Sequence, residues 1–410
     1  MKSSQLRSDI QSKYPPKGWL LVLGIILIAT NMRAPLTSVG PLIGTIRADL
    51  GISNTLAGLI TTLPLLAFAL HSPIAPKLSR RFGTPIVLFS SLLLLILGMA
   101  IRSSIGIVSL LIGTVILGLG ISICNVLMPS LIKEKYPLKI GIMIGVYSVS
   151  MNFSGAIASG ISVPMANQVG LGWKGALGLW VLLAVVALVV WLPQINCKQQ
   201  YKAKTSTANE KRTNLWKSSL AWYISIFMGL QSMLFYVVIS WLPDILKSQG
   251  MSSDSAGWTV SIMQMALLPV TFIVPIVAGR MKNQVALVIM TAVFYFIGIG
   301  GLLSGDDTLT LLWVILMGIG SGCAFSIAMM LFGLRTANAH DAAELSGMAQ
   351  SIGYLLAAVG PTLFGYLHDA TNGWKVPLIV MFVMAALLLI VGVVSGRDRF
   401  VGQTIGKDNL

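Results

Sequence analysis

A single arginine lies near the middle of the first long apolar segment of the chain. The segment runs from Trp19 to Ile46, and Arg33 falls close to its midpoint. About 20 apolar residues cross a bilayer, and a permanent cation at that depth costs roughly 2.5 to 3.5 kcal/mol. We therefore expect Arg33 to face a bundle interior or a wet cavity, where it would bind an anionic or strongly polar small solute. The alternative is a structural arginine that bonds the carbonyl groups of a neighbouring broken helix.

The residues after Arg33 weaken the helix that carries it. Pro35 removes a backbone donor, and Gly40 with Pro41 loosens the next turn. A bilayer tolerates such a break only where protein or a polar cavity satisfies the backbone. This second feature also predicts a polar site inside a membrane bundle.

Other polar side chains fall near the middle of later apolar segments. Amides and phenols can hydrogen-bond a small planar or anionic solute without presenting a competing negative charge. The same groups would otherwise hydrogen-bond neighbouring helices, for roughly 0.6 kcal/mol each. Thr37 lies one turn beyond Arg33 and shares its helix face. With Arg33, the candidate substrate-binding residues are Thr37, Asn125, Tyr147, Asn152, Gln231, Tyr236, Gln264, Gln350 and Tyr354.

Acidic residues are missing from the middle of the apolar segments. A proton-coupled carrier usually needs a titratable group that changes its accessibility. His71 is the one candidate by position, and the alternative for it is a packed, neutral histidine. A co-transported proton or other ion held near Arg33, or no coupling at all, therefore stays open.

Enzyme signatures are absent from the sequence. It contains no HExxH, GxSxG or P-loop motif, and its three histidines, His71, His340 and His368, are scattered. We therefore expect no enzyme activity, no cofactor and no metal site.

The composition is that of a membrane protein. Of 410 residues, 55% are hydrophobic and only 10% are charged, and the mean hydropathy is +0.84. A formal net charge of +15 would suit nucleic acid, but the basic residues are dispersed between apolar segments rather than gathered on a soluble face. A bilayer partner explains this pattern better than nucleic acid does.

The apolar segments predict twelve membrane-spanning helices. An even number places both termini on one side, and the excess of Lys and Arg in the alternate loops places that side in the cytoplasm. The chain would thus be a multi-pass protein of the cytoplasmic membrane. The predicted spans are residues 19–46, 54–78, 84–102, 105–132, 138–166, 173–193, 217–246, 255–280, 284–303, 308–334, 342–368 and 374–396.

The chain repeats itself at an offset of about 200 residues. The run Gly172–Lys174 recurs as Gly373–Lys375, and the glycines at 118 and 120 recur at 318 and 320. Two similar six-helix halves are the layout of a transporter whose site lies between them. We expect residues 1–193 as the first half, 194–216 as a basic cytoplasmic loop and 217–410 as the second half. One chain would enclose the pathway, so a monomer suffices.

Several motifs resemble a known group of transporters. They are NMRAPLTSVGP at 31–41, TTLPLLAF at 61–68, APKLSRRFG at 75–83, GLQSMLFYVVISWLPDIL at 229–246, LSGMAQSIGYLLAAVGP at 345–361 and GYLHDATNGW at 365–374. Together they resemble the cyanate and nitroimidazole permeases (CynX/NimT) of the major facilitator superfamily. This resemblance implies an all-helical fold of twelve helices, alternating access by rocking of the two halves, and a small organic or inorganic solute as cargo.

One motif departs from the superfamily pattern. After the second span, Pro76 stands in place of a glycine and Arg80 in place of an acid that pairs across the halves, while Arg81 and Gly83 are kept. We expect Arg80 and Arg81 to anchor the cytoplasmic side or to cap a neighbouring helix, so the usual gating ion pair is not carried over. The candidates for gating or coupling are Arg80, Arg81 and His71.

Three functions follow from these patterns. The first is a secondary transporter of a small anionic or polar solute, with Arg33 complementing its charge. The second is an exporter of drug-like nitroaromatic or heterocyclic compounds, in which aromatic side chains matter more than charge. The third is a membrane sensor without transport, with the basic loop 194–217 as its output surface. The aromatic set of the second function is Tyr147, Phe235, Tyr236, Trp258 and Tyr354.

Overall fold

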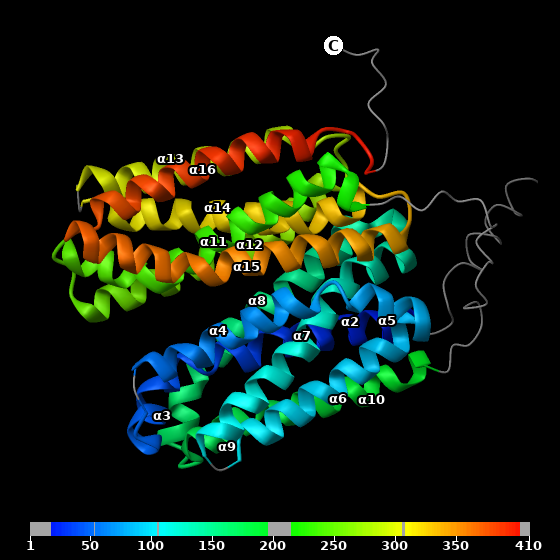
Figure 1. Ribbon diagram of the computed structural model, residues 1–410, viewed down its shortest axis with the longest axis horizontal. Coiled ribbons are helices and arrows are strands. Elements are labelled where there is room, and N and C mark those ends of the chain that lie inside the picture. Colours follow the sequence, from blue (N-terminus) through cyan, green and yellow to red (C-terminus); the bar gives the residue numbers. More distant parts are fainter. Residues whose placement is uncertain (1–17, 53, 105, 196–214, 306–307, 402–410) are drawn as a thin grey trace, which may run out of the picture.

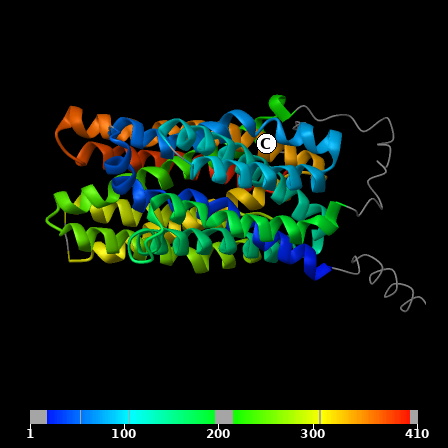
Figure 2. The same cartoon turned by 90° about the horizontal axis from the view of Figure 1, so that it is seen from below.

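The computed structural model describes residues 18–401, apart from 53, 105, 196–214 and 306–307 (Figure 1). The basic residues before Gly18 and most of the predicted linker 194–216 lie outside this part of the chain. Within it, the fold is helical and contains no strand. Figure 2 shows that the long helices run roughly along one common axis.

The first half is a bundle of six membrane-crossing segments. Its elements are α2 (Gly18–Thr37), the short 3-10 helix η1 (Gly40–Leu42), α3 (Ile43–Leu50), α4 (Asn54–His71), α5 (Ala75–Phe82), α6 (Thr84–Arg102), α7 (Ile107–Lys135), α8 (Ile140–Asn167), α9 (Gly172–Gly178) and α10 (Trp180–Ile195).

The second half repeats this arrangement after the linker. Its elements are α11 (Ser219–Ser248), α12 (Ser253–Ala278), α13 (Val285–Ser304), α14 (Thr310–Leu334), α15 (Ala339–Thr371) and α16 (Lys375–Gly396).

All twelve predicted spans are helical, so the predicted fold class is confirmed. In the described part of the chain, ten segments are long and apolar enough to cross a membrane by length and composition. The other two predicted spans are α4, of which the continuously described part is Thr62–His71, and α15, which carries charged residues towards both ends.

Three predicted spans are interrupted. The first is not one helix, because α2 ends at Thr37 and the chain turns before η1 begins at the Gly40–Pro41 pair. The second ends at His71, and α5 starts separately with Pro76 in its first turn. The sixth is divided into α9 and α10 at Leu179. Proline has no backbone donor and fits the first turn of a helix, so it favours the breaks at α5 and η1.

The two halves pack against each other at one end of the molecule. We call this end the basic end, because α5 lies there and carries Lys77, Arg80 and Arg81. In Figure 1 the ribbons of the halves converge towards α5 and separate towards α3. Helices α4, α7 and α8 contact α12, α14 and α15. The approach is close because glycines stand at the contacts: a Cβ on Gly347 would lie 2.8 Å from the Ser72 carbonyl oxygen, and one on Gly145 2.9 Å from that of Phe272.

Candidate functional site

A cavity lies between the two halves, beyond their contact at the basic end. It holds about 400 Å³ of space that protein atoms do not occupy, and this volume includes space open to solvent. The first half contributes two lining residues and the second half the other nine. They are Arg33 of α2, Asn152 of α8, Met228, Gln231, Ser232, Phe235 and Tyr236 of α11, Leu267 of α12, Ser321 and Phe325 of α14, and Tyr354 of α15.

Arg33 is the charged group of this cavity. Its side chain is half-buried, and its guanidinium carbon lies over the ring of Phe235, 5.2 Å from the ring centroid. The guanidinium makes no hydrogen bond or ion pair with another described residue. A guanidinium carries five N–H donors in a planar fork, so these donors are available to a solute.

The rest of the lining is aromatic, aliphatic or neutral and polar, and contains no Asp or Glu among the described residues. Gln231 donates to the Ser232 hydroxyl at 2.7 Å, and Asn152 donates to the Ser148 carbonyl at 2.9 Å. The Ser321 hydroxyl accepts from the Tyr295 hydroxyl at 3.0 Å. No lining group thus cancels the positive charge of Arg33, and the cavity favours an anion over a cation.

Half of the predicted substrate-binding residues line the cavity. These are Arg33, Asn152, Gln231, Tyr236 and Tyr354. Of the remaining lining residues, sequence reasoning named only Phe235, in the aromatic set of the exporter, and missed Met228, Ser232, Leu267, Ser321 and Phe325, which look like packing residues. One signal could have found two of them: Met228 and Ser232 share a helix face with Gln231.

The other five predicted residues lie outside the cavity lining. The side-chain oxygen of Asn125 accepts a hydrogen bond from the Tyr147 hydroxyl at 3.1 Å, and its main-chain carbonyl accepts one from the Gln350 amide at 3.0 Å. The Thr37 hydroxyl donates to the Gly155 carbonyl at 2.9 Å. Gln264 is half-buried. The four residues with these bonds hold helices together, as the alternative interpretation of the amides and phenols expected.

A second arginine, Arg102, has the structural role that was the alternative for Arg33: it bonds a carbonyl group of a broken helix. Arg102, the last residue of α6, is fully buried. Its Nη1 donates to the Pro35 carbonyl at 2.7 Å, just before α2 breaks. The two arginines therefore divide the roles, because Arg102 bonds the broken helix while the donors of Arg33 remain open to the cavity.

The sequence profile of the Major Facilitator Superfamily matches residues 21–361. The chain belongs to the Major Facilitator Superfamily. Members with this two-half layout bind their solute between the halves, which is where the cavity lies. This facilitator is therefore a secondary transporter of small solutes and not an enzyme.

Two relatives and one solved structure illustrate the match. The chain is 49% identical over 390 residues to the uncharacterized transporter YycB of Bacillus subtilis (strain 168), covering 95% of this chain and 96% of the relative. It is 41% identical over 380 residues to the 2-nitroimidazole transporter of Escherichia coli (strain K12), covering 93% and 96%. The proton:xylose symporter XylE is similar in fold, with a TM-score of 0.75, 14% identity, and coverage of 94% and 97%. The predicted resemblance to cyanate and nitroimidazole permeases is confirmed.

An ion pair joins the two halves of the facilitator at its basic end. Arg80 of α5 pairs with Glu344 of α15 and lies 3.0 Å from the His340 ring nitrogen Nε2. Arg80, which was expected to anchor the chain or cap a helix and was also a candidate for gating, thus makes a contact across the halves in which it supplies the positive charge. Arg81 is exposed and lies over the Phe82 ring. His71 is half-buried, lies outside the cavity lining, and its Nδ1 has no partner among the described residues.

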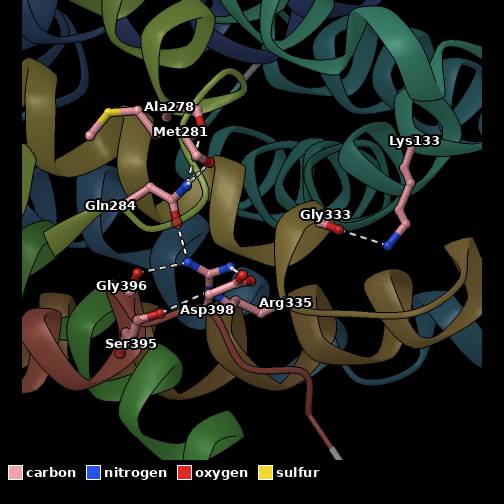
Figure 3. A network of polar contacts seen from close by, with 9 residues as sticks. All are labelled: Lys133, Ala278, Met281, Gln284, Gly333, Arg335, Ser395, Gly396 and Asp398. Atoms are coloured by element: carbon pink, nitrogen blue, oxygen red, sulfur yellow. Dashed lines mark hydrogen bonds and ion pairs between the residues drawn. The ribbon is translucent and has the colours of Figure 1, made fainter.

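Figure 3 shows two further cations at the basic end. Lys133 of α7 donates to the Gly333 carbonyl at 2.7 Å and to the Thr336 hydroxyl at 2.9 Å, so it caps the end of α14 from the other half. This arrangement is favourable, because the carbonyl end of a helix carries partial negative charge.

Arg335, the other cation in Figure 3, joins helices within the second half. It donates to the Ser395 carbonyl at 3.1 Å and the Gly396 carbonyl at 2.8 Å, and also bonds Gln284. Burial lowers the pKa of Arg335, and Asp398, 3.7 Å away, raises it in part. Arg335 directly follows the predicted span 308–334, and the structure buries it at the junction of α13, α14 and α16.

Proposed function

We propose that this facilitator moves a small anion across the cytoplasmic membrane, with Arg33 as the residue that binds the negative charge. The observation that carries the proposal is the unpaired guanidinium of Arg33 in a cavity whose described lining holds no acid. An anion supplies the charge and the acceptors that this group lacks. A cationic solute would meet repulsion from Arg33 and find no carboxylate partner.

The lining also favours a planar solute. Phe235, Tyr236, Phe325 and Tyr354 offer flat apolar surfaces around the arginine. A planar guanidinium fork matches two oxygens held in one plane, as in a carboxylate, nitrate or nitro group. The chain is similar to a protein named 2-nitroimidazole transporter, and that name includes a nitro group. This similarity supports a solute here that presents two oxygens in one plane.

An exporter of neutral nitroaromatic or heterocyclic compounds is the second candidate. The aromatic lining and the same relative favour it. In that case the rings would carry the affinity, and the charge of Arg33 would add little. A non-transporting sensor is not favoured, because the chain belongs to a family of transporters.

We further infer that the described conformation is open to the outside. Basic residues gather in the loops at the end that is closed, and the positive-inside rule makes that end cytoplasmic. Alternating access would then break the Arg80–Glu344 pair as the halves rock around the cavity. Because one chain lines the cavity, a monomer is the proposed working unit. Any coupling proton or ion would travel with the anion at Arg33, since no Asp, Glu or His is found among the described lining residues.

Thermal unfolding in detergent tests the role of Arg33. Cyanate, nitrate and short carboxylates are compared with nitroimidazoles and other neutral heterocycles on wild type, Arg33→Ala, Arg33→Lys and the control Arg47→Ala, which changes an exposed arginine. A ligand that binds the folded protein raises its melting temperature by mass action. We expect an anion to stabilise wild type and Arg47→Ala, to act weakly on Arg33→Lys, and to leave Arg33→Ala unchanged.

Two results would overturn this assignment. Equal stabilisation of wild type and Arg33→Ala by the anion would remove Arg33 from the binding site. Stabilisation of both proteins by neutral aromatics alone would make the exporter of nitroaromatic compounds the better function. Uptake of the stabilising solute into proteoliposomes then gives the direction of transport.

A further inference from the structure

We propose that Gly155 and Phe235 are positioning residues that together fix the pose of Arg33: Gly155 makes room for the stem of its side chain, and Phe235 holds its guanidinium. The proposal rests on the proposed function, because it concerns how the anion-binding group is presented. Neither residue was among the polar candidates, since one has no side chain and the other has no polar atom.

Gly155 makes room for Arg33 at the contact between α8 and α2. A Cβ at position 155 would lie 2.6 Å from Cγ and 3.5 Å from Cβ of Arg33. These atoms are near the backbone, so the clash cannot be relieved by moving only the far end of the side chain. The backbone of Gly155 is helical and its φ is not positive. The need for glycine is therefore steric, and Ala would otherwise favour the helix by about 1 kcal/mol.

Hydrogen bonds hold the two helices in register beside this glycine. The Thr37 hydroxyl donates to the Gly155 carbonyl at 2.9 Å, and the Ser154 hydroxyl donates to the Thr30 carbonyl at 3.0 Å. Because α2 and α8 are fixed here, an added methyl group would displace the arginine rather than part the helices.

Phe235 holds the other end of the same side chain from the second half. Its ring lies 5.2 Å from the guanidinium carbon and is itself steadied by an edge contact with Tyr236, with ring centroids 5.4 Å apart. A guanidinium over a ring face is attracted by the ring quadrupole while the N–H donors at its edge stay free. The Arg33–Phe235 contact thus joins α2 to α11, the first helices of the two repeats, at the cavity.

This geometry predicts which property each residue controls. Phe235 would set the affinity for a negative charge, because it holds the donors where the solute meets them. A neutral solute of the same shape would depend on it less. The ratio of affinities for an anion and for its neutral isostere is therefore the readout that a purely structural role would not move.

Binding of benzoate and its neutral isostere benzamide tests the proposal on the full chain. Each is titrated against wild type, Phe235→Leu, Phe235→Tyr, Gly155→Ala and Gly160→Ala. Gly160 is the matched control, because it lies on the same helix and a Cβ there meets nothing within 4 Å. We expect Phe235→Leu and Gly155→Ala to weaken benzoate binding by roughly threefold to tenfold relative to benzamide, the size of a partly desolvated cation–π contact. Phe235→Tyr and Gly160→Ala should retain wild-type selectivity.

The outcomes separate the two proposals. If benzoate binds wild type and Arg33→Ala equally well, the proposed function fails and this inference fails with it. If Arg33→Ala loses benzoate but Phe235→Leu and Gly155→Ala keep wild-type selectivity, the function stands and the positioning role is overturned. The positioning role also fails if Phe235→Tyr behaves like Phe235→Leu, since the ring would then not act through its π face.

A second measurement needs no ligand. The reaction of Arg33 with 2,3-butanedione is followed by peptide mass spectrometry, with the exposed Arg47 of the same molecule as the internal reference. Release of the guanidinium from the ring should change the relative rate at Arg33 by threefold or more in Phe235→Leu, and Phe235→Tyr should restore it. Equal relative rates in wild type and Phe235→Leu would overturn the proposal even if benzoate binds none of the proteins.

Discussion

Reversing the charge of Arg80 is expected to open the basic end of the transporter. The variant Arg80→Glu replaces an attraction between the halves with a repulsion, because Glu344 and the new carboxylate would face each other. The added variant Glu344→Arg restores an attraction with the charges exchanged. The pair thus offers a perturbation and its own rescue.

The structure sets the size of this effect. The side chains of Arg80 and Glu344 are 41% and 28% exposed, so solvent screens them and the pair is worth about 0.2 to 1 kcal/mol. Replacing attraction by repulsion roughly doubles the change, to about 0.4 to 2 kcal/mol, which alters an equilibrium constant about twofold to thirtyfold. Added salt should shrink the difference, since the Debye length falls from about 10 Å at 0.1 M to about 3 Å at 1 M.

Spin labels on the two halves measure the opening. Lys77 and Lys282 are exposed near the basic end, one on each half, and can each be replaced by a labelled cysteine. Double electron–electron resonance then reports the share of molecules with a long distance between labels. We expect Arg80→Glu to enlarge that share and the double exchange to reduce it. An unchanged distance distribution, or a double exchange no better than the single variant, would refute the role of this pair in closing the basic end.

Three further outcomes follow from the contacts. Gln350→Leu should lower stability by about 1 kcal/mol with unchanged solute affinity, because the Gln350 amide donates to a carbonyl of α7 and does not line the cavity. Tyr354→Ala should instead weaken solute binding, because Tyr354 lines the cavity. Thermal unfolding measures the first effect, and titration with the solute measures the second. Arg102→Met should cost about 1 to 3 kcal/mol of stability by removing a charged hydrogen bond to a buried carbonyl, and a shift in anion selectivity instead would contradict its structural role. Lys133→Met should remove the cap on α14 and shift the equilibrium towards an open basic end by up to about 2 kcal/mol. The same spin labels measure this shift, and an unchanged distribution of distances would show that the cap is dispensable.

The sequence alone determined the class of protein, the twelve spans and the two repeated halves. These properties are encoded locally, because a bilayer demands a continuous apolar stretch for each helix and basic loops follow a one-dimensional rule. The depth of Arg33 followed in the same way from its place within its segment. So did the amide of Gln231 and the phenols of Tyr236 and Tyr354, since polar side chains are conspicuous in apolar helices.

Only the tertiary structure decided which polar groups face the cavity. Asn125 and Asn152 look alike in the sequence, but the rotation of α7 turns the first towards Tyr147 and that of α8 turns the second towards the cavity. Arg80 and Glu344 are 264 residues apart, so their pairing depends on how the halves dock. Gly155 gains its role only from the stem of Arg33 that packs on it. Helix rotation and docking arise from the packing of many side chains at once, and a linear pattern of hydropathy does not contain that information.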